Sequence, residues 1–87
     1  MAIDFRRLKG LAKAGMFPNE VTFIITNHAG ETYIVMVPKE MVEERDGIAT
    51  IPVDVIDRKD DIALVSVPGE PLDSSTVSVN SSALTLA

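Results

Sequence analysis

The chain has one histidine, His28, and histidine is the side chain best suited to proton transfer near neutral pH. It lies in a short polar stretch, residues 27–30 (NHAG), between two apolar segments. Asn and Gly favour turn geometry, so this stretch predicts a hairpin turn. The simplest interpretation of a lone histidine there is a solvated turn residue, and the functional alternative is a general base. The spacing identifies no metal-binding partners for it.

A local resemblance extends the functional alternative. Residues 23–28 (FIITNH) and 53–65 (VDVIDRKDDIALV) resemble the histidine and aspartate segments of trypsin-like serine proteases of the bacterial high-temperature-requirement type. The resemblance implies that His28 is a general base and Asp61 its orienting carboxylate, within the first barrel of such an enzyme. The family's second barrel, which carries the nucleophilic serine and the oxyanion hole, has no room in this chain. Acyl transfer needs both features.

The remaining polar clusters predict no catalytic residue, metal site or cofactor. The serines near the C-terminus lack the glycine context of a nucleophile: Ser74, Ser75, Ser78, Ser81 and Ser82. Asp54, Asp57, Asp60 and Asp61 suggest calcium, but they lack the spacing and central glycine of an EF-hand loop. A solvated turn of mixed charge is the favoured interpretation, and we expect a protein that is not an enzyme.

Length and composition limit what the chain can be. With 87 residues, no cysteine and a formal net charge of −5, we expect a single domain, residues 1–87, without disulfides or thiolate zinc sites. The negative charge argues against nonspecific nucleic-acid binding as the main task. Apolar runs fall far short of the ~20 residues that span a bilayer. The N-terminal segment lacks the apolar core of a signal peptide, so we expect cytoplasmic synthesis and no membrane partner.

Residues 1–17 predict a short helical arm. Asp4 suits the N-cap position, and Gly15 and Pro18 suit a helix end. The apolar side chains at helical spacing are Phe5, Leu8, Leu11 and Ala12. The basic residues Arg6, Lys9 and Lys13 would form a stripe opposite them. Such a short helix is unstable alone in water, so it must dock on the sheet or on a neighbouring subunit.

Residues 21–67 predict a β core. Branched residues dominate segments 21–26, 32–37, 48–57 and 62–67, with turns between them and one or two helical turns over 39–45. Pro52 lacks an N–H, which places it at a sheet edge or a bulge. Residues 74–87 carry no ionisable side chain and alternate aliphatic with small polar residues, as β-prone segments do. The fold class is therefore mainly β, a small barrel or sandwich of about 5–6 antiparallel strands with one short N-terminal helix.

The strands contain more apolar surface than so short a chain is expected to cover. In segment 32–37, Ile34 and Met36 lie on one face while Val35 and Val37 lie on the other, so both faces are largely apolar. We therefore expect a closed small barrel or, in preference, burial against another chain. The uncharged segment 74–87 could be an internal strand or could add to a sheet edge of another chain.

The sequence thus favours a non-enzymatic structural or assembly module that self-associates or docks on a larger complex. One concrete version is an accessory virus or phage particle protein, such as a capsid-decorating or joining subunit. The expected partner is a protein, most simply further copies of the same chain in a homo-oligomer. The alternatives are a protease half-barrel relic using His28 and Asp61, and a small nucleic-acid-binding regulator using the basic stripe. The candidate partner-binding residues are Phe5, Arg6, Leu8, Lys9, Lys13, Val77, Val79, Leu84 and Leu86.

Overall fold

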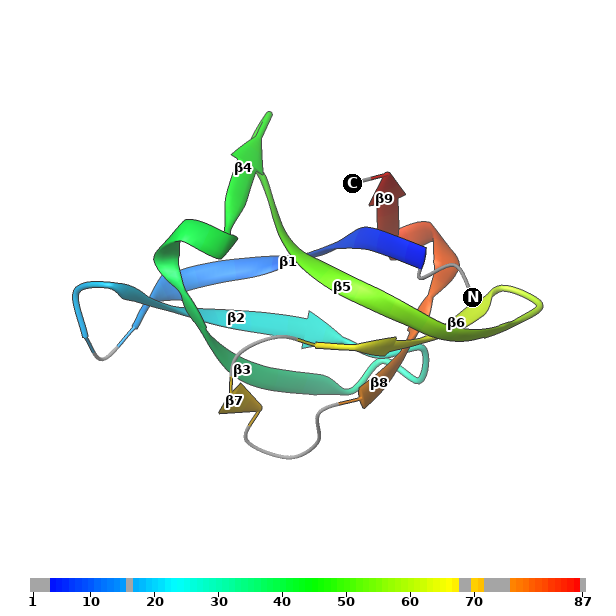
Figure 1. Cartoon of the computed structure of the whole chain (residues 1–87). Helices are drawn as coiled ribbons and strands as arrows, with labels where there is room; N and C mark the ends of the chain where they lie inside the picture. The colour runs from blue at the N-terminus through cyan, green and yellow to red at the C-terminus, as the bar shows by residue number, and fades with distance from the viewer. Residues whose placement is uncertain (1–3, 16, 68–69, 72–75, 87) are drawn as a thin grey trace.

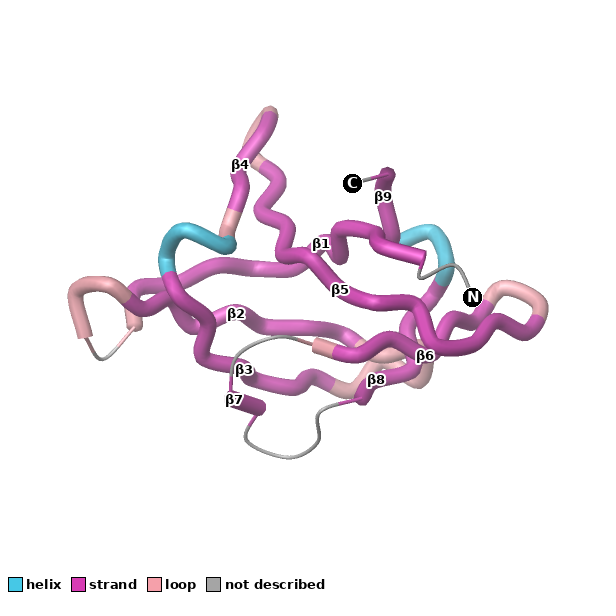
Figure 2. Tube along the Cα trace, in the orientation of Figure 1, coloured by secondary structure: helices cyan, strands magenta, loops and turns pink. Residues whose placement is uncertain are grey.

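The computed structural model describes residues 4–15, 17–67, 70–71 and 76–86 (Figures 1 and 2). Strands account for most of them. The strands are β1 (Asp4–Ala14), β2 (Glu20–Thr26), β3 (Thr32–Pro38), β4 (Glu43–Arg45), β5 (Ile48–Lys59), β6 (Ile62–Ser66), β7 (Glu70–Pro71), β8 (Thr76–Asn80) and β9 (Leu84–Leu86). Two single-turn 3₁₀ helices, η1 (Lys39–Met41) and η2 (Ser81–Ala83), precede β4 and β9. The expected mainly β class is confirmed.

All strand pairs are antiparallel, and the sheet curls into a half-barrel. The strand order is β7-β3-β2-β1-β5-β6-β8, with β4 paired to β5 and β9 paired to β1. A backbone hydrogen bond of 2.9 Å from His28 N to Ser78 O ties the turn after β2 to β8. The barrel-like architecture predicted from the sequence is therefore present.

The long strand β1 belongs to both halves of this sheet. Asp4 to Gly10 pair with β5, whereas Leu11 to Ala14 pair with β2. Gly10 lies at the change of partner. A Cβ built on it would lie 2.5 Å from Phe23 Cε2 and 2.6 Å from Ile24 O. Only glycine permits this close approach, so Gly10 allows β1 to pack tightly against β2 where the sheet curls.

The prediction of an N-terminal helix is wrong, because residues 4–14 of the supposed arm form β1. The apolar residues at helical spacing fall on opposite sides of the strand: Leu8 is buried, while Phe5 and Leu11 are exposed. Gly15 and Pro18 do lie at a chain reversal, but they follow a strand. Pairing with β5 on one side and with β2 and β9 on the other supplies backbone hydrogen bonds that a short isolated helix could not match.

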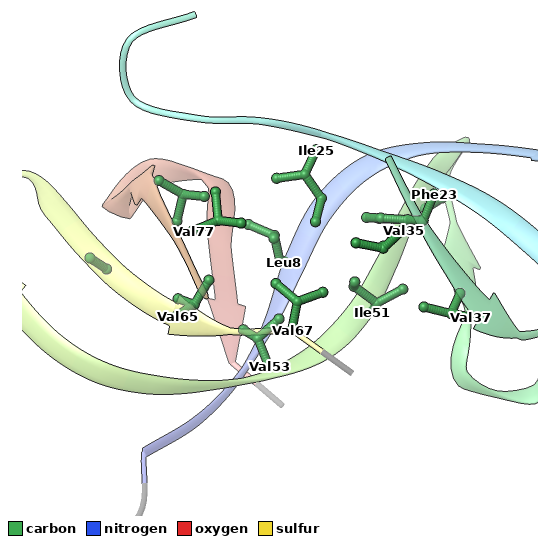
Figure 3. Close-up of a cluster of buried hydrophobic side chains, with 13 residues drawn as sticks. Leu8, Phe23, Ile25, Val35, Val37, Ile51, Val53, Val65, Val67 and Val77 are labelled. Atoms are coloured by element: carbon green, nitrogen blue, oxygen red, sulfur yellow. The ribbon is translucent and has the colours of Figure 1, made fainter. Parts of the chain in front are cut away.

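The core lies on the concave side of the half-barrel (Figure 3). Alternate residues of β2 and β3 point into it, among them Phe23, Ile25, Val35 and Val37, all essentially inaccessible to solvent. Further apolar side chains converge on them from β1, β5, β6 and β8 and from the residue after β6: Leu8, Ala49, Ile51, Val53, Ala63, Val65, Val67, Val77 and Val79. The period of two predicted for these strands is therefore the period that builds the core.

The 3₁₀ turn η1, the hairpin turn after β4 and Pro52 shape the first half of β5. Segment 39–45, expected to form one or two helical turns, has a single 3₁₀ turn and then β4, which joins β5 through Asp46 and Gly47. Both turn residues have positive φ, 52° and 79°, as a two-residue hairpin turn requires. Pro52 lies between the stretch of β5 that pairs with β4 and the stretch that pairs with β6. It is thus at a locally free edge, as its missing N–H predicts.

The uncharged C-terminal segment lies within the chain's own sheet. Strand β8 pairs with β6 along its whole length, and β9 pairs with Arg6, Arg7 and Leu8 of β1. Residues 74, 75 and 87 of the predicted segment lie outside the described residues. The segment was expected either to form an internal strand or to add to a sheet edge of another chain, and in the structure it forms internal strands.

Candidate functional site

The convex side of β1, β2 and β3 carries an apolar row that no other described element covers. Leu11, Ile24 and Ile34 are register partners across the three strands. Leu11 is 64% exposed and Ile34 40% exposed, while Ile24 between them is half-buried. Met36 extends the row along β3 and accepts a hydrogen bond of 3.4 Å from the Thr22 hydroxyl. We call Leu11, Ile24, Ile34 and Met36 the outer patch.

The positions next to the outer patch on β2 and β3 are polar but uncharged. Thr22, Thr26 and Thr32 occupy the convex positions of β2 and β3 nearest the outer patch, and the charged residues on this face lie at its margin: Lys9 and Lys13 on β1 and Glu20 at the start of β2. In a chain with 24% charged residues, this is an unusual stretch of surface. Depletion of charge around exposed aliphatic side chains is typical of the centre of a protein–protein interface.

A second feature lies between β4 and β9, which rise on the same side of the β1–β5 pair (Figures 1 and 2). A groove of about 310 Å³ runs between them. Its lining is Arg7, Lys9, Glu43, Arg45, Ile48, Thr50 and Thr85, which we call the cationic groove. Three cationic side chains face one carboxylate there, although the chain as a whole is acidic.

Arg7 is the fixed part of the cationic groove. Its Nε donates to Thr50 Oγ1 at 2.9 Å, and one terminal nitrogen donates to Met41 O at 2.8 Å and to Thr50 O at 3.0 Å. Nε also lies 3.5 Å from Glu43 Oε2, and the Arg7 side chain is 16% exposed. The guanidinium therefore joins β1 to β5, η1 and β4 and holds the floor of the groove in one geometry.

The predicted partner-binding residues separate into two groups. Phe5, Lys9 and Lys13 are exposed on the convex side of β1. Leu8, Val77 and Val79 are buried in the chain's own core, and Leu84 packs against it. Arg6 lies on the same side of β1 as Leu8, so the predicted basic stripe is divided between two faces, while the side chain of Leu86 lies outside the described part. Only the first group is on the surface available to a partner.

The only histidine, His28, lies in a turn that hydrogen bonds stabilise. The side-chain oxygen of Asn27 accepts from Ala29 N at 3.0 Å and from Glu31 N at 2.8 Å, which closes the turn around His28. The His28 ring is exposed, and its Nδ1 lies 3.4 Å from Ser78 O. Within the described residues, no hydrogen bond or ion pair joins His28 to Asp61, whose backbone carbonyl instead accepts from Ser81 N at 2.7 Å.

Two further observations concern metals and membranes. The described residues contain no group of three or more His, Cys, Asp or Glu side chains arranged to hold a metal ion. The four aspartates considered for calcium are not brought together in such a cluster. Within the same residues, no helix has the length and apolarity needed to cross a bilayer.

Comparison of the chain with protein-family models, with curated proteins and with solved structures finds no match. The functional argument therefore depends on the outer patch and the cationic groove. Neither was singled out as a site in the sequence, although the apolar character of both faces of β3 was the signal for the outer patch. The groove had no comparable signal, because its residues come from four strands.

Proposed function

We propose that this protein is a non-enzymatic assembly module that associates through the outer patch. The observation that carries the proposal is the exposed row of Leu11, Ile24 and Ile34 across three adjacent strands. Burying an apolar side chain of this size is worth about 1.5–3 kcal/mol when burial is complete. The exposed row gains this stabilisation only when a complementary apolar surface packs against it and excludes water.

The partner that we propose is a second copy of the same chain. Two identical sheet faces can pack face to face about a twofold axis, each supplying the same apolar row to the other. The uncharged side chains next to the outer patch on β2 and β3 favour this arrangement, because like charges at the centre of the face would meet across the axis. Lys9, Lys13 and Glu20 lie at the margin, where solvent can still reach them.

The size of the face sets the expected affinity. Seven residues of β2 extend over about 24 Å, and three strands are about 14 Å wide, so the face is smaller than a standard stable interface. We therefore expect a dimer that forms at about micromolar to millimolar concentration rather than an obligate one. An association of this strength suits a subunit that adds to a larger assembly through many weak contacts.

Sedimentation equilibrium tests the proposal. We expect the weight-average mass of the wild-type chain, 9.4 kDa as a monomer, to rise with concentration. Replacing Ile34→Lys places a charge within the outer patch and should abolish the rise. The matched control is Ile56→Lys, because Ile56 is also an exposed isoleucine (55%, against 40% for Ile34) and lies at the irregularity in β5, outside the outer patch.

Circular dichroism and thermal unfolding should show that both variants are folded. If the wild-type chain stays monomeric at about 1 mM, self-association through this face is excluded. If Ile56→Lys abolishes association as fully as Ile34→Lys, the interface lies elsewhere.

A further inference from the structure

The cationic groove carries a net positive charge, whereas the chain as a whole is negatively charged. Such a local concentration of positive charge favours the binding of an anion. We propose that the groove binds a small anion of the phosphate class with two or more negative charges. The cationic groove and the outer patch share no residue, although Lys9 of the groove and Leu11 of the patch are two residues apart on the same side of β1. Its volume of about 310 Å³ is at the lower end of the range for small-molecule sites.

The groove is preorganised at its base. The hydrogen bonds of Arg7 use Nε and one terminal nitrogen, and none of them uses Nη1. Because the guanidinium is already held by β5 and η1, binding an anion costs little side-chain entropy. Thr50 Oγ1 accepts from Arg7, so its own hydroxyl proton remains to be donated to a ligand oxygen.

Two exposed cationic side chains line the walls of the groove. Lys9 projects from β1 and Arg45 from β4, and both side chains are exposed. Neither makes a hydrogen bond or ion pair with any part of the chain that the structure describes. Two cations without partners on opposite sides of one groove repel each other, and a multivalent anion between them removes that repulsion. Arginine and lysine are also the usual ligands for phosphate oxygens.

The chain already places one anionic oxygen in the groove. Glu43, from β4, directs its carboxylate to Arg7, with Oε2 3.5 Å from Nε, while remaining half exposed. This carboxylate marks where an oxyanion is stabilised. It also competes with any external anion for the same guanidinium, so the proposal predicts opposite effects when Glu43 and the cations are neutralised.

A nuclear magnetic resonance titration of the ¹⁵N-labelled full chain with inorganic pyrophosphate at low ionic strength tests the site. We expect saturable shifts of the Lys9, Arg45 and Thr85 amides. Lys9→Gln and Arg45→Gln should each weaken binding by about 10-fold or more, and Glu43→Gln should strengthen it by a similar factor, since each changes one charge at about 5 Å from an anion with at least two charges. The matched control, Lys59→Gln, removes an exposed lysine from the far end of β5 and should leave the affinity unchanged.

Three outcomes would overturn the proposal. The first is the absence of saturation at about 10 mM pyrophosphate. The second is equal weakening by Lys59→Gln, which would mean that net charge alone attracts the anion. The third is equal affinity for citrate, which would remove the phosphate assignment. Repeating the titration with Ile34→Lys separates this site from self-association, because the proposed affinity does not depend on the outer patch.

Discussion

Two glycines illustrate two different reasons for a residue to be glycine in this molecule. Gly10 has no space for a side chain, because a Cβ would meet Phe23 Cε2 at 2.5 Å and the Ile24 carbonyl oxygen at 2.6 Å. Gly47 has open space around it, but its φ of 79° lies in the left-handed region. The first constraint is steric and belongs to packing, whereas the second is conformational and belongs to the hairpin turn.

This difference leads to a prediction for two alanine variants. Gly10→Ala should lower the free energy of unfolding by about 1–3 kcal/mol, because the Ile24 backbone cannot move aside as a flexible side chain can. Gly47→Ala should cost about 1 kcal/mol, and Gly47→Asn should cost less because Asn tolerates positive φ. Urea unfolding followed by circular dichroism measures all three. Equal midpoints for Gly10→Ala and wild type would contradict the close packing of β1 on β2.

At the scale of elements, β4 depends on a single side chain from another strand. It is a three-residue strand whose residues are all exposed, and it pairs with Ile48, Ala49 and Thr50 of β5. Arg7 reinforces it from below through Met41 O and Glu43. The hairpin that forms one wall of the cationic groove is therefore held by the guanidinium of β1 as well as by its own turn.

Replacing Arg7→Lys tests this dependence. A lysine cannot reproduce the planar fork that reaches the Thr50 hydroxyl, Thr50 O and Met41 O together, so we expect a loss of about 1–2 kcal/mol in stability. Amide hydrogen exchange in β4 should become faster than in the wild type. Lys9→Gln, on the same face of β1, serves as the control and should leave exchange in β4 unchanged. Equal exchange in wild type and Arg7→Lys would show that the turn alone holds the hairpin.

At the scale of the whole molecule, the net charge and the exposed apolar surface have opposite effects on association between copies. The half-barrel buries its concave side completely enough to form a core, but its convex side keeps the outer patch. The formal net charge of −5 repels a second copy at pH 7. The association that we propose between copies would therefore depend on the balance between a local apolar attraction and a repulsion spread over the whole surface.

This balance predicts how association changes with pH. The sequence pI is about 4.6, so lowering the pH from 7 toward that value removes negative charge and should strengthen association of the wild-type chain. Added salt at pH 7 should act in the same direction by screening the repulsion. Light scattering at fixed protein concentration measures both effects. An association that weakens as the pH falls would contradict an apolar interface opposed by net charge.

The sequence by itself determined most of the strands. Alternation of branched residues located β2, β3, β5 and β6, and the uncharged end located β8 and β9, because a side-chain period of two is a local property of an extended chain. The turn of Asn27 and Gly30 and the free edge at Pro52 also followed from local chemistry. The short strand β4 was missed, although the Asp46–Gly47 pair is a strong hairpin signal.

Only the tertiary structure decided the state of residues 4–14 and the position of both proposed sites. Phe5, Leu8 and Leu11 fit a helical spacing, and Gly10 interrupts the alternation that would have indicated a strand. Pairing with β2, β5 and β9, distant in sequence, outweighed that local preference. The outer patch and the cationic groove likewise join residues from separate strands, and local pattern carries no information about which strands become neighbours.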